Sequence, residues 1–153
     1  MPSPPPTVTP SAAALTAGRQ VCARLDPLMT AVGSQAGSVG YGADEVGVVF
    51  CAQHAEFRSR FPGVAPDIDQ PDDNACTDLN VYVDVRNQPR LAEVHLDGHG
   101  VDTLLADVGR DDLVTAAHAL GRRTVRTDLD RLHGLLLEIF GRAASPAARK
   151  DWE

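Results

Sequence analysis

The sequence contains almost no lysine. Lys150 is the only one among 153 residues, so nearly all of the positive charge is arginine, and the formal net charge at pH 7 is −7. A surface that binds nucleic-acid phosphates through general charge would have to oppose this overall negative field. The composition therefore disfavours nucleic acid as a partner, and its excess of Arg, Ala, Gly, Asp and Val is typical of a high-GC bacterial coding sequence.

Long apolar runs are also absent. No uninterrupted apolar stretch approaches the roughly 20 residues that cross a bilayer. The first ten residues, MPSPPPTVTP, lack the basic start and apolar core of a signal peptide. The three cysteines, Cys22, Cys51 and Cys76, are an odd number without the spacing of a disulfide framework. We therefore expect a cytoplasmic protein with reduced thiols and no membrane contact.

Several specific signatures of catalysis and ligand binding are missing. No GxSxG nucleophile motif occurs. The glycine-rich segment 33–42 lacks the lysine of a phosphate-binding loop, and the acidic segment 64–77 lacks the central glycine and the terminal glutamate of a calcium-binding EF-hand. Both segments are therefore interpreted as loops.

The segment 78–97 gives the clearest structural signal. Apolar residues alternate with polar ones over 79–85 and again over 92–96, and the intervening Asn-Gln-Pro-Arg is typical of a turn. This pattern predicts a β-hairpin with one buried face. Keeping both apolar sets on that face, we expect Val83 opposite Val94 and Tyr82 opposite His95.

The segments before and after the predicted hairpin have apolar residues at helical spacing. A first helix should begin after the N-cap Thr9 and be divided or kinked at Pro27. Three further helices are predicted over 101–108, 111–120 and from Val125 onwards. The segment 44–61 is ambiguous: its spacing slightly favours a helix, but Val46 to Phe50 also fits a short buried strand.

These elements predict an α+β fold, with two N-terminal and three C-terminal helices packed around the 78–97 hairpin and a possible third strand at 46–50. A chain of this length suits one hydrophobic core. We expect a flexible Pro-rich tail over 1–9, a single α+β domain over 10–143 and a C-terminal tail over 144–153.

Polar residues of the predicted hairpin form the first candidate site. In a continuous strand Glu93, His95, Asp97 and His99 would lie on the face opposite the core. Imidazole beside carboxylate suits acid–base chemistry or a divalent metal, so His95, Asp97 and His99 are the catalytic candidates. The candidate binding residues on the same face are Tyr82, Asp84, Glu93, His95 and Asp97.

Cysteine and histidine residues form a second candidate site. Cys51 and His54 would be one helical turn apart if their segment were helical, and Cys76, His95 or His99 could complete a zinc site. Burial of the cysteines in the core is the simpler interpretation. We therefore expect no cofactor, with a divalent metal such as zinc as the second possibility.

The functional hypothesis is a small acidic, non-catalytic module that binds another protein. Immunity proteins, antitoxins and secretion chaperones exemplify this class by analogy. The alternative is a small metal-dependent or His/Asp acid–base enzyme that uses the 93–99 cluster. The binding hypothesis is preferred because no catalytic motif is specific, whereas the acidic charge is general.

Overall fold

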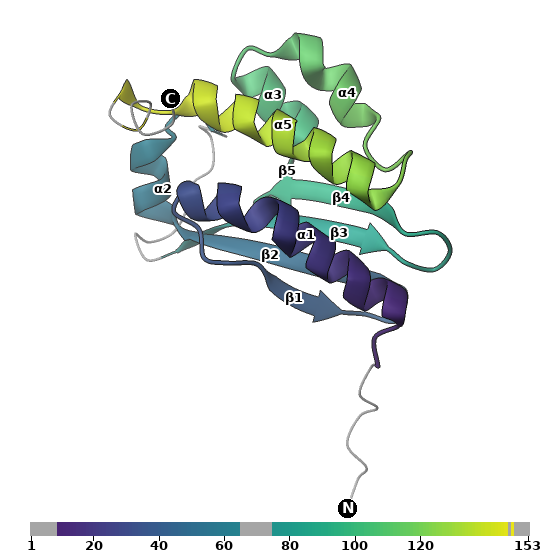
Figure 1. Cartoon of the computed structure of the whole chain (residues 1–153). Helices are drawn as coiled ribbons and strands as arrows, with labels where there is room; N and C mark the ends of the chain where they lie inside the picture. The colour runs from purple at the N-terminus through teal and green to yellow at the C-terminus, as the bar shows by residue number, and fades with distance from the viewer. Residues whose placement is uncertain (1–8, 65–74, 147, 149–153) are drawn as a thin grey trace, which may run out of the picture.

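The computed structural model describes residues 9–64, 75–146 and 148 (Figure 1). The elements, in chain order, are α1 (Ala12–Ala31), β1 (Ser38–Tyr41), β2 (Glu45–Gln53), α2 (His54–Arg60), β3 (Cys76–Asp84), β4 (Arg90–Leu96), β5 (His99–Gly100), α3 (Val101–Asp107), the 3-10 helix η1 (Asp111–Leu113), α4 (Val114–His118) and α5 (Val125–Ala143). The predicted α+β class is confirmed, but the sheet is larger than a hairpin.

The five strands form one antiparallel sheet in which their spatial order equals their order in the chain. Its centre is the pair β2–β3, which runs unbroken through nine residue pairs from Glu45↔Asp84 to Gln53↔Cys76. Burial alternates along both strands, so one face of the sheet is buried and the other is half-exposed. We call the half-exposed side the open face.

Helices α1 and α5 lie side by side over the buried face and close the core (Figure 1). Strand residues Val46, Val48 and Phe50 on β2 and Leu79, Val81 and Val83 on β3 point into this core and are almost fully buried. Each such side chain contributes roughly 1.5–3 kcal/mol by leaving water. The amphipathic sheet is therefore stable only with its helical cover.

Three phenylalanines fill the core where α2 meets α5. The ring centroids of Phe57 and Phe61 are 5.4 Å apart, and that of Phe140 lies 6.1 Å from Phe57 and 5.3 Å from Phe61. Their tilted and edge-on arrangements are the ones that aromatic pairs prefer. This cluster anchors the short helix α2 to the rest of the molecule.

Helix α1 begins two residues later than predicted. Ser11, not Thr9, is its N-cap, because the Ser11 Oγ accepts a hydrogen bond of 3.1 Å from the Ala14 N–H. The helix is not divided at Pro27, which lies on its exposed side. Leu25 and Leu28 on either side of the proline are buried, so packing holds the helix together across it.

The segments around β1 and β2 also differ from the sequence expectation. The slightly favoured helix over 44–61 is wrong for β2, where the strand alternative is correct, and it is borne out only for α2. The predicted loop 33–42 contains β1, in which Val39 and Tyr41 pack towards Gly18 of α1. The segment forms a strand and not a helix because the alternate residues from Val46 to Ala52 are all buried, which is the periodicity of a strand.

The β3–β4 hairpin forms, but the predicted register is wrong by two residues. Val81 lies opposite Val94, whereas we expected Val83 there, and Tyr82 lies opposite Glu93. The register shifts between Tyr82 and Val83, so Ala92 of β4 is the extra residue of a β-bulge. A shift of two leaves residues 93–96 on the expected faces, so the alternation of the sequence could not detect it. Beyond the bulge the expected inward position of Ala92 is wrong, because Ala92 is exposed and Leu91, opposite Val83, is buried instead.

The C-terminal end of α5 continues into buried residues. Ala144 and Ala148, which the sequence assigned to a tail, are only 6% and 7% exposed. The Ser145 N–H donates a hydrogen bond of 2.8 Å to the Arg60 carbonyl at the end of α2. Within the described part of the chain, no helix combines the length and apolar character needed to cross a membrane.

A buried carboxylate organises the connection between α4 and α5. Asp128 is fully buried, and its Oδ2 accepts hydrogen bonds from the Gly121 N–H at 2.9 Å and from the Arg123 N–H at 3.2 Å. Gly121 has a φ of +92°, and a Cβ at this position would overlap the carbonyl oxygen of Leu91. This connection therefore reaches strand β4 only because residue 121 is glycine.

We predict that Gly121→Ala destabilises the protein more than Gly109→Ala. Gly109 also has a positive φ, +78°, but nothing lies within 4 Å of a Cβ there. Its substitution should cost only the left-handed backbone strain, about 1 kcal/mol. At Gly121 the overlap with Leu91 adds to this strain, for a total of about 2–4 kcal/mol. Urea unfolding of both variants measures the difference, and equal losses would contradict the close contact.

Candidate functional site

The open face presents residues of four neighbouring strands, β1 to β4, in aligned rows. No helix of the described chain buries this face, and the residues that β2 and β3 turn towards it are half-exposed. One row joins Gly40, Gly47, Tyr82 and Glu93, and the next joins Ser38, Val49, Asn80 and His95. The predicted binding residues Tyr82, Asp84, Glu93 and His95 therefore come together on this surface.

Tyr82 lies at the centre of the open face. A Cβ on Gly47, directly opposite on β2, would be 2.9 Å from the Tyr82 Cε1, so the tyrosine ring covers the glycine. The His95 ring lies diagonally beside it, with centroids 5.9 Å apart and an angle of 33° between the planes. The predicted proximity of Tyr82 and His95 thus survives the change of register.

A shallow hollow lies beside Tyr82. Its volume is about 390 Å³, and its lining comes from residues 38–42, from alternate residues of β2 and from Tyr82. Nothing lies within 4 Å of a Cβ built on Gly40. The hollow therefore exists because Gly40 and Gly47 place no side chains on this part of the face.

The charge around the hollow is acidic. Glu45 and Asp84 are opposite each other across β2 and β3, and Glu93 lies opposite Tyr82. Arg86 lies 2.7 Å from the Asp84 carboxylate, and its hydrogen bonds hold the pKa of Asp84 below the ordinary value. Among the described residues, Glu45 and Glu93 form no ion pair. Arg86 partly offsets the acidic charge, because Asp84 first, and Asp44 and Glu45 to a smaller extent, raise the pKa of Arg86.

Two cysteines and an aspartate meet at the other end of the open face. One ligand atom each from Cys51, Cys76 and Asp78 lies within 4.8 Å of the other two, and we call this set the thiol–carboxylate cluster. Burial, then the neighbouring Cys76 thiol and Asp78 carboxylate, raise the pKa of Cys51 to about 12. The Asp78 Oδ1 is buried and has no hydrogen-bond partner among the described groups.

The cluster contains only part of the predicted zinc site. Cys51 and Cys76 are brought together, but Asp78 was not a sequence candidate. The supposed helical spacing of Cys51 and His54 is wrong because Cys51 is in β2. The His54 Nδ1 instead lies 2.7 Å from the Oγ1 of Thr77, a residue buried on the other side of the sheet.

The expectation that residues 93–99 share one face is wrong for His99. Strand β4 ends at Leu96, Asp97 adopts a φ of +46°, and His99 pairs opposite Leu96. His99 therefore belongs to the face of Leu96, not to that of His95. The carboxylate of Asp97 accepts a hydrogen bond of 3.0 Å from the Asp78 N–H, which fixes it in the turn.

The structure also forms a histidine–aspartate pair that the sequence did not predict. His118 Nε2 lies 3.0 Å from the Asp102 Oδ2 beside a hollow of about 220 Å³, and this contact lowers the pKa of Asp102. The two side chains are 61% and 43% exposed, so water surrounds the pair. No spacing rule links residues 16 apart on two short helices, and the sequence therefore gave no signal.

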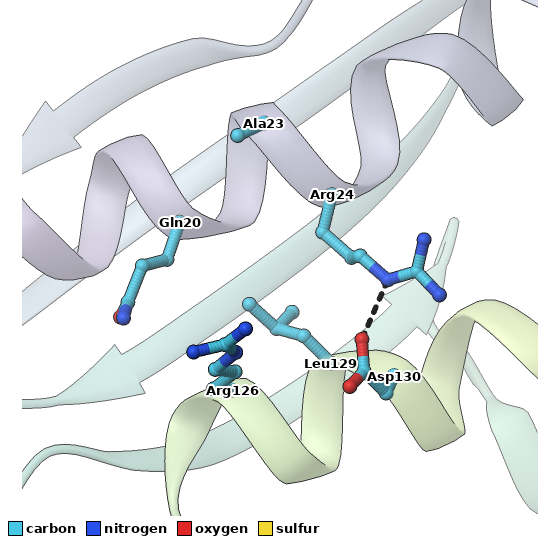
Figure 2. A pocket seen from close by; sticks show the side chains of 6 residues that line it. All are labelled: Gln20, Ala23, Arg24, Arg126, Leu129 and Asp130. Atoms are coloured by element: carbon cyan, nitrogen blue, oxygen red, sulfur yellow. Dashed lines mark hydrogen bonds and ion pairs between the residues drawn. The ribbon is translucent and has the colours of Figure 1, made fainter.

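A separate groove lies between α1 and α5 (Figure 2). Its volume is about 470 Å³, and the Arg24 Nε bridges it to the Asp130 Oδ1 at 2.7 Å. Gln20 and Arg126 line the groove beside Leu129. The ion pair is largely exposed and contributes at most about 1 kcal/mol. The groove contains none of the residues that the sequence singled out.

The structure defines the class of this protein as an α+β fold whose antiparallel sheet has one face covered by helices and one face open. Comparisons with family models, with curated proteins and with solved structures find no match to the chain. Functional inference therefore depends on the geometry of the open face and its side chains.

We predict that His133, next to the α1–α5 groove, makes the protein sensitive to acid. Burial, and then the charge of Arg24, lower the pKa of His133, while Asp130 opposes this shift. His133 is therefore protonated at a higher pH in the unfolded chain than in the folded chain. The free energy of unfolding should fall as the pH drops below about 6.5 towards the pKa of His133 in the folded protein. In the His133→Gln variant, the part of this pH dependence that comes from His133 should disappear. Urea unfolding between pH 8 and 5 measures it, and identical slopes would refute the assignment.

Proposed function

We propose that the protein is a non-catalytic binding module whose open face docks an arginine-bearing segment of another protein. The observation that carries this proposal is the arrangement around Tyr82: an aromatic ring held over Gly47, beside a hollow of about 390 Å³, with Glu45 lining the hollow and Glu93 next to the ring. These features match the three properties of an arginine side chain, which are its length, its planar cation and its apolar stem.

A guanidinium group can stack on the Tyr82 ring and meet a carboxylate at the same time. Cation–π stacking at an exposed site contributes about 0.5–1 kcal/mol, and an exposed ion pair contributes a similar amount or less. One such contact is weak, so the partner segment must use several rows of the face. The half-exposed Val49 and Asn80 in the adjacent row extend the surface available to it.

The disposition of the acid–base candidates supports binding over catalysis. His95 is beside Tyr82, Asp97 is engaged with the Asp78 backbone, and His99 is on the other face. A general acid and base have to approach one substrate position together. The enzyme hypothesis based on the 93–99 cluster therefore has less geometric support than the binding hypothesis.

The overall charge supports the same partner chemistry. A formal net charge of −7 steers basic molecules towards the protein over distances of about one Debye length. Immunity proteins, antitoxins and secretion chaperones are examples of accessory modules that act by such docking, and the present protein is proposed to act in a comparable way.

We predict that an octapeptide of alternating arginine and alanine binds the open face. In NMR titrations the largest amide shifts should occur at Gly40, Gly47, Tyr82 and Glu93, and affinity should fall steeply as salt rises because exposed charges are screened. Tyr82→Ala should weaken binding about fivefold, the equivalent of roughly 1 kcal/mol. The double variant Glu45→Gln, Glu93→Gln should also weaken it and reduce the salt dependence.

The matched control is the double variant Asp107→Asn, Asp111→Asn, which removes the same charge from exposed positions on α3 and η1. It should bind the peptide almost as tightly as the parent protein. An equal loss in both double variants would show that only net charge matters, and this result would overturn the proposed site. Equal binding of a glutamate–alanine octapeptide would do the same.

A further inference from the structure

The thiol–carboxylate cluster is a second feature of the open face, and docking of an arginine segment does not use it. Cys51 on β2 lies directly opposite Asp78 on β3, and Cys76 is two residues before Asp78 and therefore on the same face. We propose that Cys51, Cys76 and Asp78 form an exchangeable Zn²⁺ site with three protein ligands. This inference does not depend on the proposed function.

The spacing of the three donors suits a tetrahedral ion. Two ligands that each lie about 2.3 Å from zinc at the tetrahedral angle are roughly 3.8 Å apart. The three donor atoms of the cluster lie within 4.8 Å of one another, so small side-chain rotations bring them to this spacing. Two thiolates and a carboxylate are ligand types that zinc accepts.

A buried, unpartnered oxygen points independently to a cation. The Asp78 Oδ1 is inaccessible to water and accepts no hydrogen bond from the part of the chain that is described. Such an atom is unfavourable if it stays unsatisfied, because folding removes the hydrogen bonds that water would make to it. Among the ion pairs of the described residues, none involves Asp78. A bound cation would satisfy this oxygen and replace the two thiol protons, which pass to the solvent.

The strand register favours a metal over a disulfide. Cys76 lies directly opposite Gln53, so Cys51 and Cys76 are diagonal neighbours. Diagonal neighbours on an antiparallel pair are roughly 7–8 Å apart, beyond the Cα separation of most disulfides. A direct sulfur–sulfur bond would therefore require backbone movement in the best-paired part of the sheet, whereas a bridging ion would not.

The fourth coordination position remains open. Gln53 is the nearest additional donor by register, but its Oε1 accepts a hydrogen bond of 2.8 Å from the Glu56 N–H as the N-cap of α2. Cys76 is exposed to solvent, so water can complete the tetrahedron from that side. A site with three ligands and one water exchanges its metal more readily than a closed four-ligand structural site.

The test uses reduced, metal-free full-length protein without a histidine tag. Titration with Co²⁺ should produce a thiolate-to-metal charge-transfer band and the visible spectrum of a tetrahedral complex, saturating at one equivalent, and Zn²⁺ should abolish both. Cys51→Ser and Cys76→Ser should each lower Zn²⁺ affinity more than about 100-fold, because even loss of an outer-shell partner costs 10–100-fold. Asp78→Asn should weaken the affinity while it retains the charge-transfer band.

Cys22→Ser is the matched control, because this third cysteine is on α1 and its Sγ lies near the Gly37 carbonyl. It should bind metal like the parent protein. Zinc should also slow alkylation of Cys51 and Cys76, but not of Cys22, in the unaltered protein, so the result does not depend on whether the serine variants fold. Equal affinity in the Cys51 and Cys22 variants, a Co²⁺ complex without thiolate charge transfer, or zinc-independent alkylation of all three cysteines would overturn the site.

Discussion

The unbroken pairing of β2 with β3 is the constraint on which the rest of the structure depends. Because side chains alternate along both strands, this one register places Val48 and Val81 in the core and Gly47 and Tyr82 on the open face. A slip of one residue would exchange the two sets. Stability and the candidate sites are therefore coupled: the contacts that bury the inner face under α1 and α5 also align the outer rows.

Much of this fold could be predicted from local patterns. The alternation over 79–85 identified β3, and the continuous apolar stripe after Val125 identified α5. The segment 46–50 was ambiguous because its valines fit either period, and only the buried neighbours on β3 decide between them. The bulge at Ala92 was not predicted because the alternation over 92–96 continues regularly to Ala92, whereas the extra residue exposes Ala92 and turns Leu91 towards the core.

The candidate sites were harder to predict because they join residues that are distant in sequence. The acidic and aromatic residues of the hairpin could be selected on one local pattern, and the structure groups Tyr82 with His95 as that pattern implied. In contrast, Asp78 joins Cys51 only through the β2–β3 register, which spans the intervening segment 54–75. Similarly, His118 meets Asp102 through the packing of α3 against α4.

The strand order and the contact between the first and last long helices have a consequence for biosynthesis. Each strand pairs with the preceding strand of the chain, so the sheet can grow one strand at a time as the polypeptide leaves the ribosome. Helix α1 precedes all five strands in the chain, but its neighbour α5 follows all of them. The apolar surface shared by these helices therefore stays uncovered until α5 has been synthesised, and nascent chains halted before residue 125 should be prone to aggregation.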